Sequence, residues 1–144
     1  MYKVEEGKVF VLIAHPGGPL YKNKDDGYWT IPKGEVEGKD LLEAAKREFI
    51  EEVNIKITDN QELLDLGESK NKSGKLNKIW AFEGDLPEKY VLSCNTFEME
   101  WPFKSGRKEK FPEIDNIQFF EIEEAKAKVS ASLVIFLERL QEKL

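Results

Sequence analysis

The segment that most constrains the fold is an amphipathic helix predicted for residues 41–53. With a turn of about 100° per residue, its apolar residues Leu42, Ala45, Phe49 and Val53 fall in one arc of the helical wheel. Such a stripe predicts a helix that packs on a core along one face and meets solvent elsewhere.

Three carboxylates crowd into the arc next to this stripe. Glu48, Glu51 and Glu52 lie there with no lysine among them. Like charges three or four residues apart repel by roughly 0.2–0.5 kcal/mol per pair, and the helix dipole favours cations in the C-terminal half. A bound divalent cation would relieve both problems, since Mg²⁺ and Mn²⁺ take carboxylate oxygens. The alternative is a solvated, Glu-rich face, but the position beside the apolar stripe favours a metal site.

The residues around the helix predict its ends and the loop before it. Asp40 is a good N-cap, and Glu43 three residues later completes a capping box. Asn54 can end the helix in the left-handed conformation. Ahead of the helix, Pro32 fixes a turn and Gly34 permits a close backbone approach.

Length and charge limit the class of protein. The 144 residues are most naturally one domain, 1–144, long enough to bury a core. The net charge of −6 argues against a general nucleic-acid-binding surface. It still allows a small anionic ligand, provided that a metal screens the site.

Cysteine usage and hydropathy bear on the compartment. Cys94 is the one cysteine and cannot form an internal disulfide, which fits a reducing compartment. It is expected to be a packing residue rather than a nucleophile, because the only histidine, His15, lies far away in sequence. The polar start MYKVEEGK and the lack of a long apolar run predict no signal peptide and no membrane span, hence a cytoplasmic protein.

The rest of the chain reads as strands followed by helices. A continuous apolar run at 8–15 predicts a strand buried on both faces. His15 at its end is more often structural than a ligand or base, and Gly17 and Gly18 read as a turn. Further strands are expected at 28–31, 62–66, 78–83 and 117–122, with a hairpin loop at 67–75. Residues 123–144 are expected to be helical, broken near Val129–Ser130, with the core stripe Leu133, Phe136, Leu137 and Leu140.

Together, PKG at 32–34, REFIEE at 47–52 and Ile55 resemble the Nudix box, the signature of the Nudix hydrolases. That pattern is Gly, five residues, Glu, seven residues, Arg-Glu-hydrophobic-x-Glu-Glu, then x-Gly-hydrophobic. The segments HPGGP, WTIPKGE and SCNTFEMEWP are further similar to a bacterial MutT-like subgroup. The resemblance implies an α/β fold, an α/β/α sandwich with a mixed β-sheet, and a Mg²⁺-dependent hydrolase of phosphoanhydrides in a small nucleotide-type substrate.

The resemblance also implies roles for single residues. Glu48, Glu51, Glu52 and the main-chain carbonyl at Gly34 would bind Mg²⁺, or Mn²⁺ in its place, and Arg47 would hold the carboxylates by ion pairing. The chemistry fits these residue types independently of the family. Metal ions held by carboxylates neutralise phosphate charge and activate water, and a carboxylate can act as general base.

The chain departs from the pattern in the loop before the helix. Arg47 follows Gly34 by thirteen positions rather than fourteen, so Lys39 or Asp40 replaces the first glutamate. Asn54 stands where the pattern has glycine, and it too tolerates a positive φ. The shorter loop supports an alternative function, a Nudix-fold nucleotide-binding module with weak or no turnover.

Residues outside the box give further candidates. Glu98 and Glu100 could supply the general base, which family members often take from outside the box, or they could be outward residues of a strand. Trp80 could stack on a nucleobase or belong to a sheet face, and Lys33 and Arg107 could meet substrate phosphates or lie in solvent. No nucleic-acid polymer or membrane partner is expected, and the oligomeric state stays open between monomer and homodimer.

Overall fold

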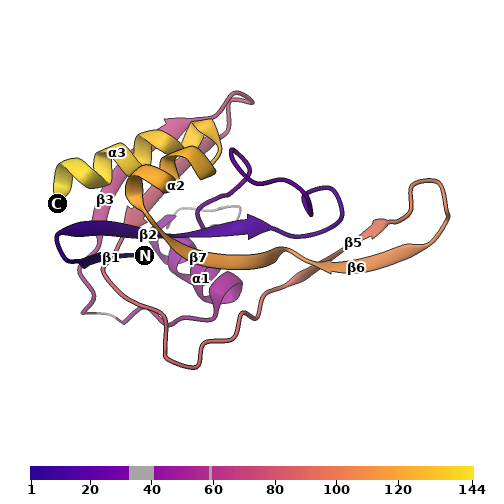
Figure 1. Cartoon of the computed structure of the whole chain (residues 1–144), viewed down its shortest axis with the longest axis horizontal. Coiled ribbons are helices and arrows are strands. Elements are labelled where there is room, and N and C mark those ends of the chain that lie inside the picture. Colours follow the sequence, from indigo (N-terminus) through magenta and orange to yellow (C-terminus); the bar gives the residue numbers. More distant parts are fainter. Residues whose placement is uncertain (33–40, 59) are drawn as a thin grey trace.

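A computed structural model describes residues 1–32, 41–58 and 60–144 of the chain. Figure 1 shows the elements in chain order: β1 (Tyr2–Glu5), β2 (Lys8–Pro16), α1 (Leu41–Val53), β3 (Leu64–Lys70), β4 (Leu76–Ala81), β5 (Thr96–Glu100), β6 (Lys108–Pro112), β7 (Ile114–Glu121), α2 (Ile122–Lys128), a short 3-10 helix (Ala131–Leu133) and α3 (Val134–Lys143).

The central sheet has the order β1-β2-β7 and is antiparallel. Residues 11–15 of β2 are all buried, as predicted for a strand covered on both faces. The Tyr2 amide donates to the Phe82 carbonyl at 2.9 Å, and the Gly84 amide donates to the Tyr2 carbonyl at 2.8 Å. These bonds form a parallel bridge between Tyr2 and Glu83, which joins the β3-β4 hairpin to the central sheet and makes the pairing mixed.

Two hydrophobic clusters lie on opposite faces of this sheet. On one face Val11 and Ile13 of β2 pack with residues of α2 and α3, among them Phe136. On the other face Ile117 of β7 packs against a cluster formed by Phe49 and Val53 of α1 with Phe82. Figure 1 shows α2 and α3 together on one side of the strands and α1 on the other. The predicted α/β/α sandwich is confirmed.

Helix α1 has the predicted bounds and the predicted end. Asn54 adopts a φ of 56°, and its amide donates to the Ile50 carbonyl at 2.8 Å. The predicted apolar stripe is only partly correct, because Leu42 and Ala45 are half-buried and Ala44 is buried in their place. Leu42 and Ala45 border a pocket rather than the core. The predicted cap at Asp40 lies outside the described residues.

The C-terminal helices break where the sequence predicts. Val129 is extended, with φ −74° and ψ 157°, and the expected stripe is buried at Leu133, Phe136, Leu137 and Leu140. The extended residue pairs with Trp29, whose amide donates to Lys128 O at 3.0 Å. The expected strand at 28–31 is therefore reduced to isolated bridges through Trp29 and Thr30. No helix in the described part of the chain is long and apolar enough to cross a membrane.

The β3-β4 hairpin is longer than predicted. Strand β3 starts at Leu64 and continues to Lys70, past the Gly67 bulge, where φ is +78°. The turn is therefore limited to residues 71–75, where the Asn71 carboxamide accepts hydrogen bonds from the amides of Ser73 and Lys75 at 3.0 and 2.9 Å. The expected loop at 67–75 is corrected accordingly.

Strands β5 and β6 form a separate two-stranded sheet, the β5-β6 ribbon, which extends away from the body of the molecule (Figure 1). Its register places Glu98 opposite Lys110 and Glu100 opposite Lys108. These pairs share one face of the ribbon because side chains alternate along a strand. The other face is mainly apolar, with Phe97 opposite Phe111 at 6.0 Å between ring centroids.

Candidate active site

A pocket of about 970 Å³ surrounds α1 and extends to β4. Its walls come from the helix itself, from the chain start, from β4 and from two positions beside the β5-β6 ribbon. The polar and aromatic side chains in its lining include Lys46, Glu48, Glu51, Glu52, Asn77, Lys78, Trp80, Asn95 and Glu113.

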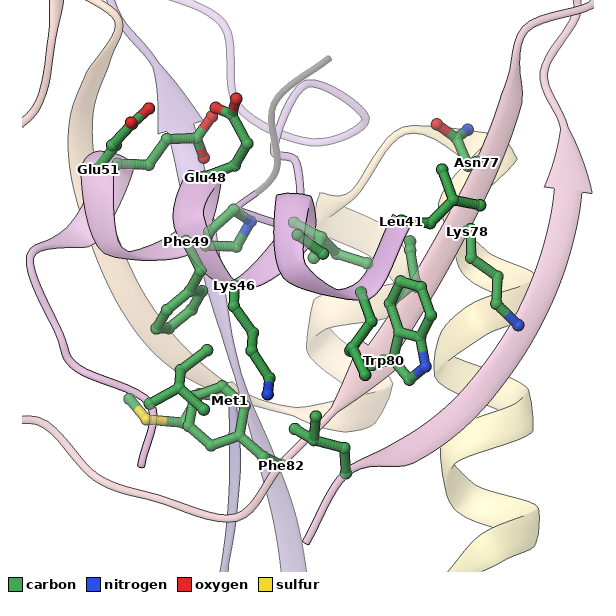
Figure 2. A pocket seen from close by; sticks show the side chains of 18 of the residues that line it. Met1, Leu41, Lys46, Glu48, Phe49, Glu51, Asn77, Lys78, Trp80 and Phe82 are labelled. Atoms are coloured by element: carbon green, nitrogen blue, oxygen red, sulfur yellow. The ribbon is translucent and has the colours of Figure 1, made fainter. Parts of the chain in front are cut away.

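The predicted metal ligands of α1 all line this pocket. Glu48 and Glu51 are three residues apart and project from the same side of the helix (Figure 2). Their side chains are 20% and 45% exposed. Arg47 lies beside both, with Nη2 3.5 Å from Glu48 Oε1 and Nε 3.9 Å from Glu51 Oε1. The arginine is thus in contact with the carboxylates that the family resemblance assigns to it.

The donor chemistry suits a hard divalent cation, since carboxylate oxygens are its preferred ligands. Among residues 1–32, 41–58 and 60–144, however, no three or more His, Cys, Asp or Glu side chains are grouped closely enough to hold a metal ion. Gly34 and Lys33, the predicted backbone ligand and phosphate contact, lie outside the described residues.

A fourth carboxylate, Glu113, enters the pocket from outside α1. It lies between β6 and β7, and its amide donates to the Asn95 carbonyl at 2.9 Å, so both residues line the pocket together. No local sequence signal marks Glu113, and the residues predicted as the general base are Glu98 and Glu100. Those two lie on the ribbon, opposite lysines, and do not line the pocket. Only the register of β6 and β7 could have revealed this position.

Of the remaining substrate-binding candidates, Trp80 lines the pocket and Arg107 does not. Arg107 is exposed in the turn of the ribbon and does not line the pocket. Trp80 is half-buried and does line it, with Lys78 Nζ 5.1 Å from its ring centroid. Lys78 Nζ also lies 2.5 Å from Asp65 Oδ1, and this hydrogen bond lowers the pKa of Asp65. In Figure 2, Trp80 and Lys78 lie across α1 from Glu48 and Glu51.

His15 has the structural role that its position favoured. Its side chain is 9% exposed, with Nδ1 2.7 Å from Asp115 Oδ1 and Nε2 2.6 Å from the Lys24 carbonyl. These bonds fasten the loop after β2 to β7. Gly17 contributes to the same junction, because its amide donates to the Glu113 carbonyl at 2.9 Å and an added Cβ would lie 2.0 Å from Pro112 O. Cys94 is half-buried and donates to Ile114 O at 3.3 Å, which fits a packing role.

Met1, at one wall of the pocket, carries a buried amino group. Burial lowers the pKa of this amine from 8.0 to about 5, because the charged form loses its hydration. The Met1 carbonyl accepts a hydrogen bond from the Leu12 amide at 2.9 Å, which holds the residue beside β2. In a chain that begins at Met1, burial thus disfavours the charged form of the amine in the folded protein.

This shift predicts that a chain beginning at Met1 gains stability as the pH rises from about 5 to about 8. In that window the unfolded chain binds a proton that the folded chain does not, so the free energy of unfolding increases with pH. The contribution of one group is at most about 1.4 kcal/mol per pH unit. Urea unfolding across the window measures it. N-terminal acetylation removes the titrating group, so the acetylated chain should show a smaller slope, and equal slopes would contradict the assignment.

A sequence model described as the NUDIX domain matches residues 3–140. The chain belongs to the Nudix family. The family resemblance of the REFIEE helix and the predicted hydrolase class are thereby confirmed. No match was found among curated proteins.

Two solved structures are similar to this Nudix protein over nearly its whole length. One is an Ap4A hydrolase of C. elegans in a binary complex, with a TM-score of 0.67 and 24% identity, covering 99% of this chain and 92% of that one. The other is a MutT protein from Methanosarcina mazei Go1, with a TM-score of 0.57 and 18% identity, covering 98% and 88%. At these identities the two structures establish the shared fold.

Proposed function

We propose that this Nudix protein is a Mg²⁺-dependent hydrolase that cleaves a phosphoanhydride bond in a nucleoside diphosphate-linked or nucleoside triphosphate-type substrate. The observation that carries the proposal is the joint presence of Glu48, Glu51 and Glu113 in one pocket. The helix α1 supplies the first two of these carboxylates, and the segment between β6 and β7 supplies the third.

Glu48, Glu51 and Glu52 are the proposed ligands of Mg²⁺, or of Mn²⁺ in its place. When bound, the ion supplies charge neutralisation for phosphate oxygens and activation of water. Arg47 keeps Glu48 and Glu51 on one side of α1, because its guanidinium lies within 4 Å of both carboxylates.

Glu113 is the proposed general base. In the hydrolysis a water oxygen forms a new bond to phosphorus, the bridging P–O bond breaks, and the water loses a proton. Glu113 can accept that proton because it lines the pocket and is exposed there. Glu98 and Glu100 are less suited to this role, since neither lines the pocket and each lies opposite a lysine in the ribbon register.

The nucleotide character of the substrate is supported by the half-buried indole of Trp80 in the same pocket. Its ring offers a stacking surface for a base, and aromatic stacking is worth about 1–3 kcal/mol per base. The lysines Lys46 and Lys78 line the pocket near it and could balance phosphate charge. The C. elegans neighbour, an Ap4A hydrolase, supports a nucleotide substrate as well.

A substrate panel tests this proposal. Purified protein is incubated with nucleoside triphosphates, nucleoside diphosphate-linked compounds and dinucleoside polyphosphates, and the released phosphate or nucleotide is quantified. We expect turnover of at least one class with Mg²⁺ or Mn²⁺, and background rates with excess chelator. Nucleotide binding without product release on the whole panel would overturn the hydrolase and favour the binding module.

A further inference from the structure

The segment that follows β4, residues 82–95, is tied to the rest of the molecule at both of its ends. At its start the Gly84 amide donates to the Tyr2 carbonyl at 2.8 Å. At its end Asn95 accepts the amide of Glu113 at 2.9 Å. Phe82 and Asn95 at the two ends both line the pocket. The segment therefore runs from one wall of the proposed active site to another.

Between these ends, Tyr90 makes a bond to the helix that carries the acidic residues. Its hydroxyl donates to the main-chain carbonyl of Val53, the last residue of α1. The final carbonyls of a helix have no partner within the helix, and α1 has no basic side chain in its last turn. Burial raises the pKa of Tyr90, so the hydroxyl keeps the proton that it donates.

Apolar contacts also hold the C-terminal turn of α1. Phe49 meets the Phe82 ring edge-on at 5.2 Å between centroids, and Val53 is fully buried in the same cluster. These apolar contacts hold the helix on the sheet but are not directional. The hydrogen bond from Tyr90 is directional, and its acceptor is one residue beyond Glu52 and two beyond Glu51.

We propose that Tyr90 is a positioning residue of the active site. Its hydroxyl fixes the last turn of α1, with Glu51 and Glu52, relative to the segment that ends at Asn95 beside Glu113. This inference rests on the proposed function, because it assigns Tyr90 to the alignment of the proposed metal ligands. Residues that orient metal ligands affect metal affinity even though they do not touch the metal.

The test is Tyr90→Phe, which removes the hydroxyl and keeps the ring. The matched control is Tyr21→Phe, the same chemical change at a residue that is 38% exposed and does not line the pocket. Mn²⁺ binding is measured without substrate, by the loss of the free-ion electron paramagnetic resonance signal on titration. We expect Tyr90→Phe to weaken Mn²⁺ binding roughly 10-fold and Tyr21→Phe to leave it unchanged.

The kinetics provide a second readout on the same proteins. The Mg²⁺ concentration that gives half of the maximal rate should rise in Tyr90→Phe, while the KM for substrate at saturating Mg²⁺ should change little. Both quantities are measured well below the unfolding temperature of each protein. A lowered unfolding temperature with unchanged Mn²⁺ affinity would overturn the positioning role and leave the proposed function intact. Absence of Mn²⁺ binding by the unaltered protein would overturn the proposed metal site, and the role of Tyr90 with it.

Discussion

Glu51→Gln and Glu52→Gln are each expected to lower turnover by about 100-fold or more. Loss of a group that only orients a metal ligand already costs roughly 10–100-fold, and loss of the ligand itself should exceed that. The fold should persist, because Glu51 is 45% exposed and removal of one charge relieves repulsion on the helix. Steady-state rates at saturating Mg²⁺ and circular dichroism melts measure the two effects.

Glu43→Gln provides the matched control on the same helix. Glu43 lies in the first turn of α1, does not line the pocket, and has Oε1 3.6 Å from Lys46 Nζ. The change is chemically identical, so a general effect of lost helix charge would appear in all three variants. Unchanged rates in Glu51→Gln and Glu52→Gln would disprove their assigned metal role.

Phe136→Ala is expected to destabilise the protein by about 3–5 kcal/mol. The ring is fully buried between α3 and the sheet, in the larger of the two hydrophobic clusters. A domain of this size typically has a net stability of only about 5–15 kcal/mol, so the variant should unfold at a much lower urea concentration. Equilibrium unfolding in urea gives the difference in the free energy of unfolding, and comparison of the m-values checks that the unfolding transition is otherwise the same.

The neighbouring change Ile135→Ala separates burial from helix propensity. Ile135 is 38% exposed on the same helix, and alanine there is at least as good a helix former. Its effect should stay within about 0.5 kcal/mol, as for most surface positions. Equal losses in the two variants would mean that α3 does not cover the sheet through Phe136.

Local sequence patterns were sufficient for the helices and for the buried strand. The bounds of α1, the left-handed Asn54 and the break at Val129 follow from apolar spacing and end signals that lie within a few residues. Strand β2 was predicted for the same reason, since a continuous apolar run needs cover on both faces. The box on α1 then identified the family.

The features that could not be predicted from the sequence depend on contacts between segments that lie far apart in the chain. Glu113 reaches the pocket only because β6 and β7 place it beside Asn95, and no local motif marks it. The hydroxyl of Tyr90 meets Val53 across 37 positions of sequence. Glu98 and Glu100 matched the expectation of alternating strand residues, but their ribbon extends away from the body of the molecule and neither side chain lines the pocket.

The β5-β6 ribbon also has a consequence for self-association. The Trp101 amide donates to the Arg107 carbonyl at 2.9 Å, so these two residues form a hydrogen-bonded pair. Hydrogen-bonded and non-hydrogen-bonded pairs alternate along an antiparallel ladder. The backbone amides and carbonyls of Glu98, Glu100, Lys108 and Lys110 therefore point outward from the two edges of the ribbon. If a second copy paired antiparallel with β6 so that the two Glu109 residues lay opposite each other, Lys108 of each copy would lie opposite Lys110 of the other. The same symmetric pairing along β5, centred on Met99, would place Glu98 opposite Glu100. Like charges directly opposite are destabilising. This repulsion disfavours both of these symmetric pairings of the ribbon with a second copy.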